Sequence, residues 1–211
     1  MQRKPHSGMP VADAVQVLID HRASGQIVVT NQGAARLWPK LSRRPLDLHY
    51  NPSTMGGAIP LALGLALAQT QREVLVVSGD GALLMSLGAL VTVSGSGAAN
   101  LTVVVLDNGL YEVTGGQKTP ATAAVDFAGL AKSAGFPSAY RFRDLAVWRG
   151  QAAAALSAAG PRFISLEVEP MPPEYLRSPT PPLAEQIVEF RREVGGRVEI
   201  SSVQSCCRAG S

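Results

Sequence analysis

Two polar loops, each placed directly after an apolar run, carry side chains that could bind a metal ion and a phosphate. One is Gly-Asp-Gly at 79–81, and the other is Asp-Asn-Gly at 107–109. Glycines allow close approach of the backbone, and free N–H groups at a helix start favour a phosphate. Asp80 would repel a bare phosphate, but a divalent cation between the two removes the conflict, because Mg²⁺ binds protein and phosphate oxygens together. Asn108 would supply a second oxygen ligand, so the sequence predicts a metal–phosphate site.

Taken alone, Gly-Asp-Gly is also typical of a tight turn with an aspartate helix cap. Residues 82–107, the length of one strand–helix–strand unit, separate it from Asn108. In open α/β sheets, ligands bind beyond the carboxyl ends of the strands, where these loops would meet. A third loop of this kind, Thr-Asn-Gln-Gly at 30–33, follows another apolar run. The combination favours the metal–phosphate interpretation over the isolated turn.

The elements that must position these loops alternate along the chain. Apolar runs that read as buried strands occur at 26–30, 73–78, 101–106 and 162–168. Segments with helical periodicity occur at 11–21, 34–41, 58–70, 82–93, 126–133, 145–159 and 183–194. Strands that are apolar on both faces and alternate with helices predict a parallel sheet covered on both sides. We therefore expect a doubly wound α/β fold with a mostly parallel sheet and helices on both faces.

The domain boundaries follow from composition. Residues 10–170 are predicted to form the α/β domain, preceded by an N-terminal tail at 1–9. Six prolines between 170 and 182 predict an extended arm, so 171–194 is interpreted as a Pro-rich arm with a C-terminal helix. Residues 195–211 are expected to be a disordered tail.

Composition excludes several classes of protein. Of the 211 residues, 46% are hydrophobic and 17% charged, which is typical of a globular chain, and the net charge of +3 is too small to indicate a nucleic-acid-binding protein. The only cysteines, Cys206 and Cys207, are adjacent, which argues against a disulfide framework or a cysteine zinc site. The most apolar stretch, 58–68, is too short to span a bilayer. We expect a soluble, cytoplasmic protein with no nucleic-acid or membrane partner.

The motifs resemble the diphosphate-binding domain of thiamine-diphosphate-dependent enzymes, in which Gly-Asp-Gly is followed one unit later by Asn, often Asn-Asn. Here Asp107 replaces the first Asn. The resemblance covers roughly residues 10–190. Within the family the chain is most similar to the β subunit or C-terminal domain of sulfopyruvate and phosphonopyruvate decarboxylases. The segments that carry this are VTNQG at 29–33, TMG at 54–56, GALLMSLGAL at 81–90 and LDNGLYEVTGGQ at 106–117.

The resemblance implies a set of binding residues. Mg²⁺ would be held by the side chains of Asp80 and Asn108 and the main-chain carbonyl of Leu110. Met55 would support the bent shape of thiamine diphosphate, and Ser53 stands where the family usually has Gly. The full set of residues that the resemblance assigns to the cofactor is Asn31, Gln32, Gly33, Ser53, Thr54, Met55, Gly79, Asp80, Gly81, Ala82, Asn108, Leu110 and Tyr111.

The resemblance also implies an incomplete active site. In the family, a glutamate that contacts the cofactor's pyrimidine belongs to a second, pyrimidine-binding domain, and one α/β domain uses up this chain. We therefore expect no catalytic residue here, and a heteromer with a pyrimidine-binding α subunit and with further copies of the chain. The function implied is decarboxylation of a small 2-keto acid such as sulfopyruvate or phosphonopyruvate. A carboligase like acetolactate synthase, a 2-oxoacid oxidoreductase subunit and an inactive cofactor-binding paralogue remain alternatives.

The sequence leaves alternative roles for several residues near the motifs. Thr114 and Gln117 either face the substrate or form a polar turn. His49 precedes the cofactor loop, and a lone histidine there is more often structural than catalytic. Glu112 is either a solvated or interface charge or a site residue. The remaining candidates are Tyr111, interpreted as pocket wall or core, and three arginines, Arg141, Arg143 and Arg149, interpreted as a solvated face rather than a substrate-binding one.

Overall fold

The fold is described from a computed structural model, which covers residues 8–120 and 125–195. The expectations for residues 1–7, for the tail beyond 195 and for Cys206 and Cys207 lie outside the described residues. Within these ranges, no helix is long and apolar enough to cross a membrane.

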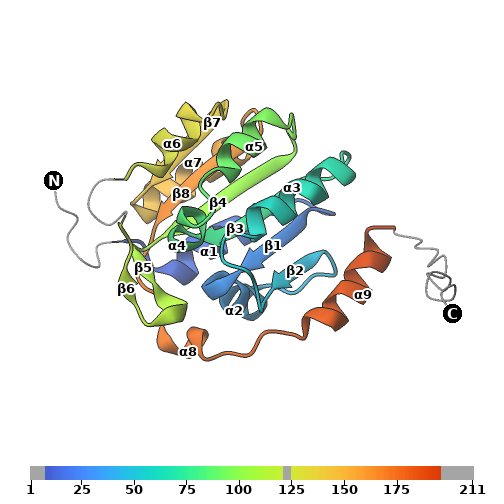
Figure 1. Ribbon diagram of the computed structural model, residues 1–211, viewed down its shortest axis with the longest axis horizontal. Helices are drawn as coiled ribbons and strands as arrows, with labels where there is room; N and C mark the ends of the chain where they lie inside the picture. The colour runs from blue at the N-terminus through green and yellow to red at the C-terminus, as the bar shows by residue number, and fades with distance from the viewer. Residues whose placement is uncertain (1–7, 121–124, 196–211) are drawn as a thin grey trace, which may run out of the picture.

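One six-stranded sheet organises the chain, with strand order β2-β1-β3-β4-β8-β7 and every neighbouring pair parallel (Figure 1). Its strands are β1 (Ile27–Asn31), β2 (Asp47–Tyr50), β3 (Val74–Gly79), β4 (Leu101–Asp107), β7 (Ser138–Phe142) and β8 (Arg162–Glu167). A separate two-stranded antiparallel ribbon pairs β5 (Leu110–Tyr111) with β6 (Gln117–Lys118). The predicted doubly wound parallel fold is confirmed.

Helices cover both faces of the sheet. They are α1 (Val11–Asp20), α2 (Gln32–Leu41), α3 (Ala58–Ala68), α4 (Asp80–Leu84), α5 (Ala89–Gly95), the 3-10 turn η1 (Glu112–Thr114), α6 (Phe127–Ser133), α7 (Leu145–Ser157), α8 (Pro173–Leu176) and α9 (Leu183–Glu193). The core on one face takes most of its helical side chains from α3, α5 and α6, and the core on the other takes its own from α1, α2 and α7.

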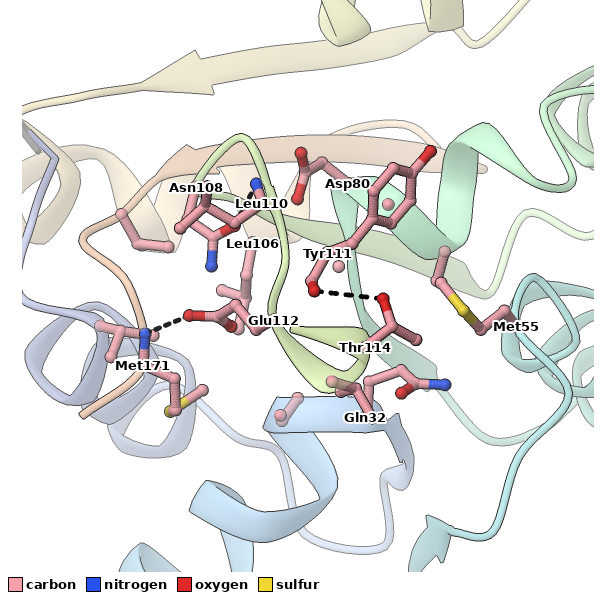
Figure 2. Close-up of a pocket in the computed structure, with 18 residues that line it drawn as sticks. Gln32, Met55, Asp80, Leu106, Asn108, Leu110, Tyr111, Glu112, Thr114 and Met171 are labelled. Atoms are coloured by element: carbon pink, nitrogen blue, oxygen red, sulfur yellow. Dashed lines mark hydrogen bonds between the residues drawn. The ribbon is translucent and has the colours of Figure 1, made fainter. Parts of the chain in front are cut away.

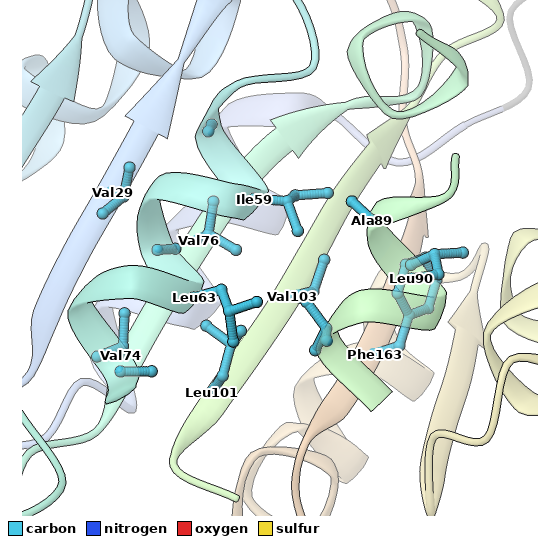
Figure 3. Packing of buried hydrophobic residues seen from close by; sticks show 14 of the residues in the cluster. Val29, Ile59, Leu63, Val74, Val76, Ala89, Leu90, Leu101, Val103 and Phe163 are labelled. Atoms are coloured by element: carbon cyan, nitrogen blue, oxygen red, sulfur yellow. The ribbon is translucent and has the colours of Figure 1, made fainter. Parts of the chain in front are cut away.

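Alternation along the central strands explains why two cores form. Val74 and Val76 of β3 point into the α3/α5/α6 core, whereas Leu75 and Val77 point into the opposite one, because successive side chains of a strand face opposite ways. Figure 3 shows the first core, in which β3 and β4 lie beneath α3 and α5. Burial on both faces is the reason that these strands are continuously apolar.

Some elements differ from expectation. The single helix predicted at 82–93 is wrong: α4 ends at Leu84 and α5 begins at Ala89, with i→i+3 hydrogen bonds such as Ser86 N–H to Leu83 O between them. The edge strands β2 and β7 were not predicted, because polar residues interrupt their apolar pattern. The arm after 170 is not extended throughout, since it contains α8.

The C-terminal helix anchors the arm against the sheet edge. Phe190 of α9 is buried in the α3/α5/α6 core. Gln186 makes two hydrogen bonds with the backbone of His49 in β2, accepting from its N–H at 2.8 Å and donating to its carbonyl at 3.2 Å. The arm between β8 and α9 therefore runs along the carboxyl-end edge of the sheet (Figure 1).

Candidate active site

A small pocket lies at the carboxyl-end edge of the sheet, where β3 and β4 end side by side (Figure 2). Strand register pairs Gly79 with Leu106, so the loops that follow the two strands start next to each other. The pocket encloses about 50 Å³. Its walls are formed by Val11, Gln32, Gly33, Ala34, Met55, Gly79, Asp80, Gly81, Ala82, Leu106, Asn108, Leu110, Tyr111, Glu112, Val113, Thr114, Val168 and Met171.

Asp80 is the first residue of α4 and only 1% exposed. One carboxylate oxygen accepts a hydrogen bond from the Thr119 hydroxyl at 3.1 Å. Burial, and next the charge of Asp107 at the end of β4, raise the pKa of Asp80 to about 7. A buried carboxylate beside a second carboxylate is a place where a cation is favoured.

Asn108 follows β4 and shares the pocket with Asp80. Its side-chain oxygen accepts a hydrogen bond from the Leu110 N–H at 2.9 Å, which identifies the oxygen end of the carboxamide. Leu110 then pairs with Lys118 in the β5–β6 ribbon. The Leu110 carbonyl oxygen lies 3.7 Å from the position that a Cβ on Gly81 would occupy, so it faces the start of α4.

The last residue of β1 contributes a buried amide. Asn31 is fully buried, and within the described residues neither its side-chain nitrogen nor its oxygen has a hydrogen-bond partner. Gln32 starts α2 with a positive φ of 52° and donates a hydrogen bond to the Ser53 hydroxyl at 2.9 Å. An unpaired buried amide is costly unless a ligand or water satisfies it.

Comparison with known protein families finds one that matches most of the chain. Residues 25–166 match the family model of the thiamine pyrophosphate enzyme, C-terminal TPP binding domain. The chain belongs to this family. The resemblance inferred from the Gly-Asp-Gly and Asn motifs is thereby confirmed.

Two curated relatives of this thiamine pyrophosphate domain are decarboxylases. The sulfopyruvate decarboxylase subunit beta of Methanothermobacter thermautotrophicus is 40% identical over 152 residues, covering 71% of this chain and 77% of the relative. The phosphonopyruvate decarboxylase of Streptomyces viridochromogenes is 38% identical over 146 residues, covering 69% of this chain and 36% of the relative. The match thus spans about a third of the phosphonopyruvate enzyme.

A solved structure shares the fold. Benzoylformate decarboxylase from Polynucleobacter necessarius superposes with a TM-score of 0.63 at 20% identity, covering 80% of this chain and 35% of that one. At this level of identity the similarity concerns the fold alone.

Of the residues that sequence reasoning assigned to the thiamine pyrophosphate cofactor, the structure brings ten together around the pocket. They are Gln32, Gly33, Met55, Gly79, Asp80, Gly81, Ala82, Asn108, Leu110 and Tyr111. Asn31, Ser53 and Thr54 do not line it, although Ser53 is bonded to Gln32. Thr114 lines the pocket, whereas Gln117 does not and instead donates to the Thr114 carbonyl at 3.1 Å.

Tyr111 closes the pocket over the glycine motif. A Cβ placed on Gly81 would lie 2.6 Å from Cδ1 of Tyr111, so the aromatic ring packs directly against the Gly81 backbone. Only glycine leaves room for this contact. Tyr111 is therefore a pocket-wall residue, as one of the sequence interpretations had it.

Two wall residues could not be assigned to the site from the sequence. Glu112 was left open there, and the structure places its half-buried carboxylate in the pocket wall, accepting a hydrogen bond from the Met171 N–H at 2.5 Å. Burial raises the pKa of Glu112. Met171 comes from the arm, 59 positions further along the chain. No local sequence signal connects the two.

The arginines at the end of β7 are engaged in ion pairs. Arg141 and Arg143 both contact one carboxylate oxygen of Glu167, at 2.5 and 3.0 Å. None of the three arginines considered in the sequence lines the pocket, and Arg149 is exposed on α7. This agrees with a surface role for the group.

His49 is buried in β2 rather than exposed to the pocket. Its Nδ1 is 2.9 Å from the hydroxyl of Thr30. Burial, followed by the charges of Arg22 and Arg43, lowers the pKa of His49 to about 4. The structure therefore supports the structural interpretation of this histidine.

Acid should destabilise the chain through His49. The unfolded state binds a proton near pH 6.5, whereas the folded state excludes it until about pH 4. The contribution of His49 to the free energy of unfolding is then fully present above pH 6.5. It is lost as the pH falls toward 4, by about 3 kcal/mol in total. Urea unfolding at pH 7.5 and pH 4.5 should show that His49→Gln loses less stability on acidification than the unsubstituted chain does. Equal losses in the two proteins would refute the assignment.

Proposed function

We propose that this chain is the diphosphate-binding subunit of a thiamine-diphosphate- and Mg²⁺-dependent decarboxylase of small 2-keto acids. The observation that carries the proposal is the pocket in which Asp80 and Asn108, from the ends of adjacent strands, meet the glycine motif. The names of the relatives, sulfopyruvate and phosphonopyruvate decarboxylases, support a substrate with a second acidic group.

The residues present fit Mg²⁺. Its ligands would be the Asp80 carboxylate, the Asn108 carboxamide oxygen and the Leu110 carbonyl, all hard oxygen donors of the kind that Mg²⁺ prefers. The raised pKa of Asp80, which burial and Asp107 cause, supports a role for a cation in offsetting this charge. A bound ion would keep Asp80 ionised at neutral pH.

The residues also fit a diphosphate. The N–H groups of Gly81 and Ala82 lie at the start of α4, and Gly81 has no side chain of its own that would block an anion. Gln32 of the pocket wall and the unsatisfied amide of Asn31, which lies just outside that wall at the end of β1, would contact the other side of the diphosphate. The Tyr111 ring now covers Gly81, so it would turn aside on binding.

The pocket is too small for the whole cofactor. Its volume of about 50 Å³ compares with 300 Å³ or more for typical sites of small organic ligands. The diphosphate end would enter the pocket, while Met55 at its wall would contact the rest of the molecule. When bound, thiamine diphosphate supplies the electron-accepting ring that allows a 2-keto acid to lose CO₂. The contribution of this chain is to hold and orient that cofactor.

An uncharged face next to the pocket supports a partner subunit. No Asp, Glu, Lys or Arg occurs at 51–71 or at 81–100, the segments that contain α3 and α5. These helices lie in contact with each other (Figure 1). Exposed apolar side chains on and next to them are Leu67, Met85, Leu87 and Val91. Exposed apolar patches of this kind mark interaction sites, and we assign this face to a pyrimidine-binding subunit that supplies the catalytic glutamate, in a heteromer that also includes further copies of this chain.

Co-purification with the partner, followed by product analysis, tests the function. The complex with Mg²⁺ and thiamine diphosphate should convert sulfopyruvate or phosphonopyruvate to the corresponding aldehyde and CO₂. A coupled hydroxyketo acid would instead identify a carboligase, and an acyl-CoA an oxidoreductase. Cofactor binding without turnover of any 2-keto acid would identify an inactive paralogue.

A methyl group on Gly81 should impair cofactor binding. In Gly81→Ala the new Cβ displaces the Tyr111 ring and occupies the surface that the diphosphate would contact. We expect thiamine diphosphate to bind about 10- to 100-fold more weakly by calorimetry, the range typical of losing charge-assisted hydrogen bonds. Gly88→Ala, which meets no atom within 4 Å, is the control and should bind normally. Equal affinities in both variants would contradict the placement of the diphosphate.

A further inference from the structure

Glu112 connects three parts of the pocket wall. Its carboxylate accepts a hydrogen bond from the Met171 N–H of the arm at 2.5 Å and lies beside the Asn108 side chain (Figure 2). A Cβ on Gly33, at the start of α2, would lie 3.7 Å from Oε2 of Glu112, which is van der Waals contact, so the carboxylate lies against the start of α2. In Figure 2, Glu112 lies between Asn108 and Met171.

The two groups next to the Asn108 side chain, the Leu110 N–H and the Glu112 carboxylate, determine which way its carboxamide faces. The Leu110 N–H can only donate, so it takes the oxygen end at 2.9 Å. The Glu112 carboxylate, which accepts hydrogen bonds, lies on the side of the NH₂ end and favours that end there. A carboxamide turned by 180° would lose the bond to Leu110, place its NH₂ group against the Leu110 N–H and place its oxygen beside the Glu112 carboxylate. Glu112 and Leu110 therefore select one orientation together.

We propose that Glu112 is a positioning residue, which fixes the orientation of the Asn108 carboxamide and thereby keeps its oxygen available as a metal ligand. This inference rests on the proposed function, because it assigns Asn108 to Mg²⁺. Groups that hold a metal ligand in orientation typically contribute about 10- to 100-fold to metal affinity. The hydrogen bond from the Met171 N–H to Glu112 connects the orientation of the Asn108 carboxamide to the position of the arm.

Glu112→Gln keeps the size of the side chain and changes only its hydrogen-bonding groups, so it tests the orientation of Asn108 without creating a cavity. The glutamine oxygen still accepts from the Met171 N–H, but its NH₂ group now meets the NH₂ group of Asn108. Asn108 relieves this conflict by turning over, which removes the acceptor of the Leu110 N–H. In the ligand-free full chain, amide hydrogen exchange at Leu110 should accelerate about tenfold, the loss expected for one hydrogen bond, while exchange at Met171 changes little.

Asn108→Asp provides the decisive second background. A carboxylate at 108 accepts through both oxygens, so one can bond the Leu110 N–H and the other the glutamine NH₂ of Glu112→Gln. The double variant should therefore restore the protection of Leu110 that Glu112→Gln alone removes. Glu174→Gln, which changes an exposed carboxylate in the same arm, is the matched control and should leave Leu110 exchange unchanged.

Magnesium titration at fixed thiamine diphosphate gives the functional readout. Glu112→Gln should raise the Mg²⁺ concentration at half-saturation about tenfold in the Asn108 chain, and should not raise it in the Asn108→Asp chain. An equal increase in the half-saturating Mg²⁺ concentration in both backgrounds would mean that Glu112 acts only through its hydrogen bond to Met171 of the arm. That result would overturn the inference. Unchanged Leu110 exchange in Glu112→Gln would overturn it as well.

The two proposals fail in different ways. If the unsubstituted protein shows no Mg²⁺-dependent binding of thiamine diphosphate, the proposed function is overturned, together with the metal role of Asn108. If it binds normally and Glu112→Gln binds equally well, the proposed function stands and the role of Glu112 is wrong.

Discussion

Asp80→Asn should abolish Mg²⁺-dependent binding of thiamine diphosphate while the fold is retained. The substitution keeps the size of the side chain and an oxygen that can accept from the Thr119 hydroxyl. It removes the one charged ligand among the three oxygen donors proposed for the metal, so the diphosphate charge is left uncompensated. We expect a loss of affinity on the order of 100-fold or more, measured by calorimetry with Mg²⁺ present.

The same substitution should stabilise the metal-free protein. The folded-state pKa of Asp80 is raised to about 7 from an ordinary value of 3.8, so ionised Asp80 destabilises the fold. For a carboxyl shifted upward, stability is greatest below pH 4 and falls as the pH rises toward 7, by up to about 4 kcal/mol. Asp80→Asn lacks this titration and should unfold several degrees higher than the unsubstituted chain in chelator at pH 7.5.

Opposite effects on binding and on stability are what distinguish a binding carboxylate from a structural one. Asp13→Asn, which changes an exposed carboxylate in α1, is the control and should alter neither quantity. Wild-type cofactor affinity in Asp80→Asn would overturn the metal assignment. A lower unfolding temperature in chelator would show instead that ionised Asp80 stabilises the fold.

The interior of the sheet was predictable because its strands have no polar face. β3 and β4 are buried on both sides, so an unbroken apolar run was sufficient to predict each. β2 was not, because Asp47 and His49 interrupt it. Asp47 forms a buried ion pair with Arg22 from the end of α1, and His49 contacts Thr30. These polar residues are tolerated only through tertiary partners that the local sequence does not reveal.

Some residues of the candidate site could be predicted from the sequence, and others could not, for the same reason. Asp80 and Asn108 were predictable, because each directly follows a recognisable strand and parallel strands end at one edge of the sheet. Glu112 was not assigned, because its partner Met171 reaches the pocket from an arm far along the chain. The break between α4 and α5 was also missed. There Leu87 and Gly88 continue the apolar and small-residue pattern of a helix, while the backbone turns.

Val91→Lys should prevent association with the partner subunit without unfolding the chain. Val91 is 64% exposed on α5, while its neighbours Leu90 and Val93 are buried in the core, so the lysine need not disturb the interior. In a complex, the ammonium group would be buried on a face that carries no charge at 51–71 or 81–100. An unpaired charge buried in an interface weakens binding strongly, and we expect a loss of about 100-fold or more.

Val188→Lys makes the same chemical change on a different surface. Val188 is 72% exposed on α9, where Glu185, Glu189 and Arg192 already give the helix a charged face. A lysine there should leave association unaffected, and both variants should unfold at the temperature of the unsubstituted chain. Co-purification and size-exclusion chromatography of the co-expressed subunits would then separate the two surfaces. If Val91→Lys still associates fully, or if Val188→Lys is the variant that fails, the partner does not bind the α3/α5 face, and the missing part of the active site must come from another side of the pocket.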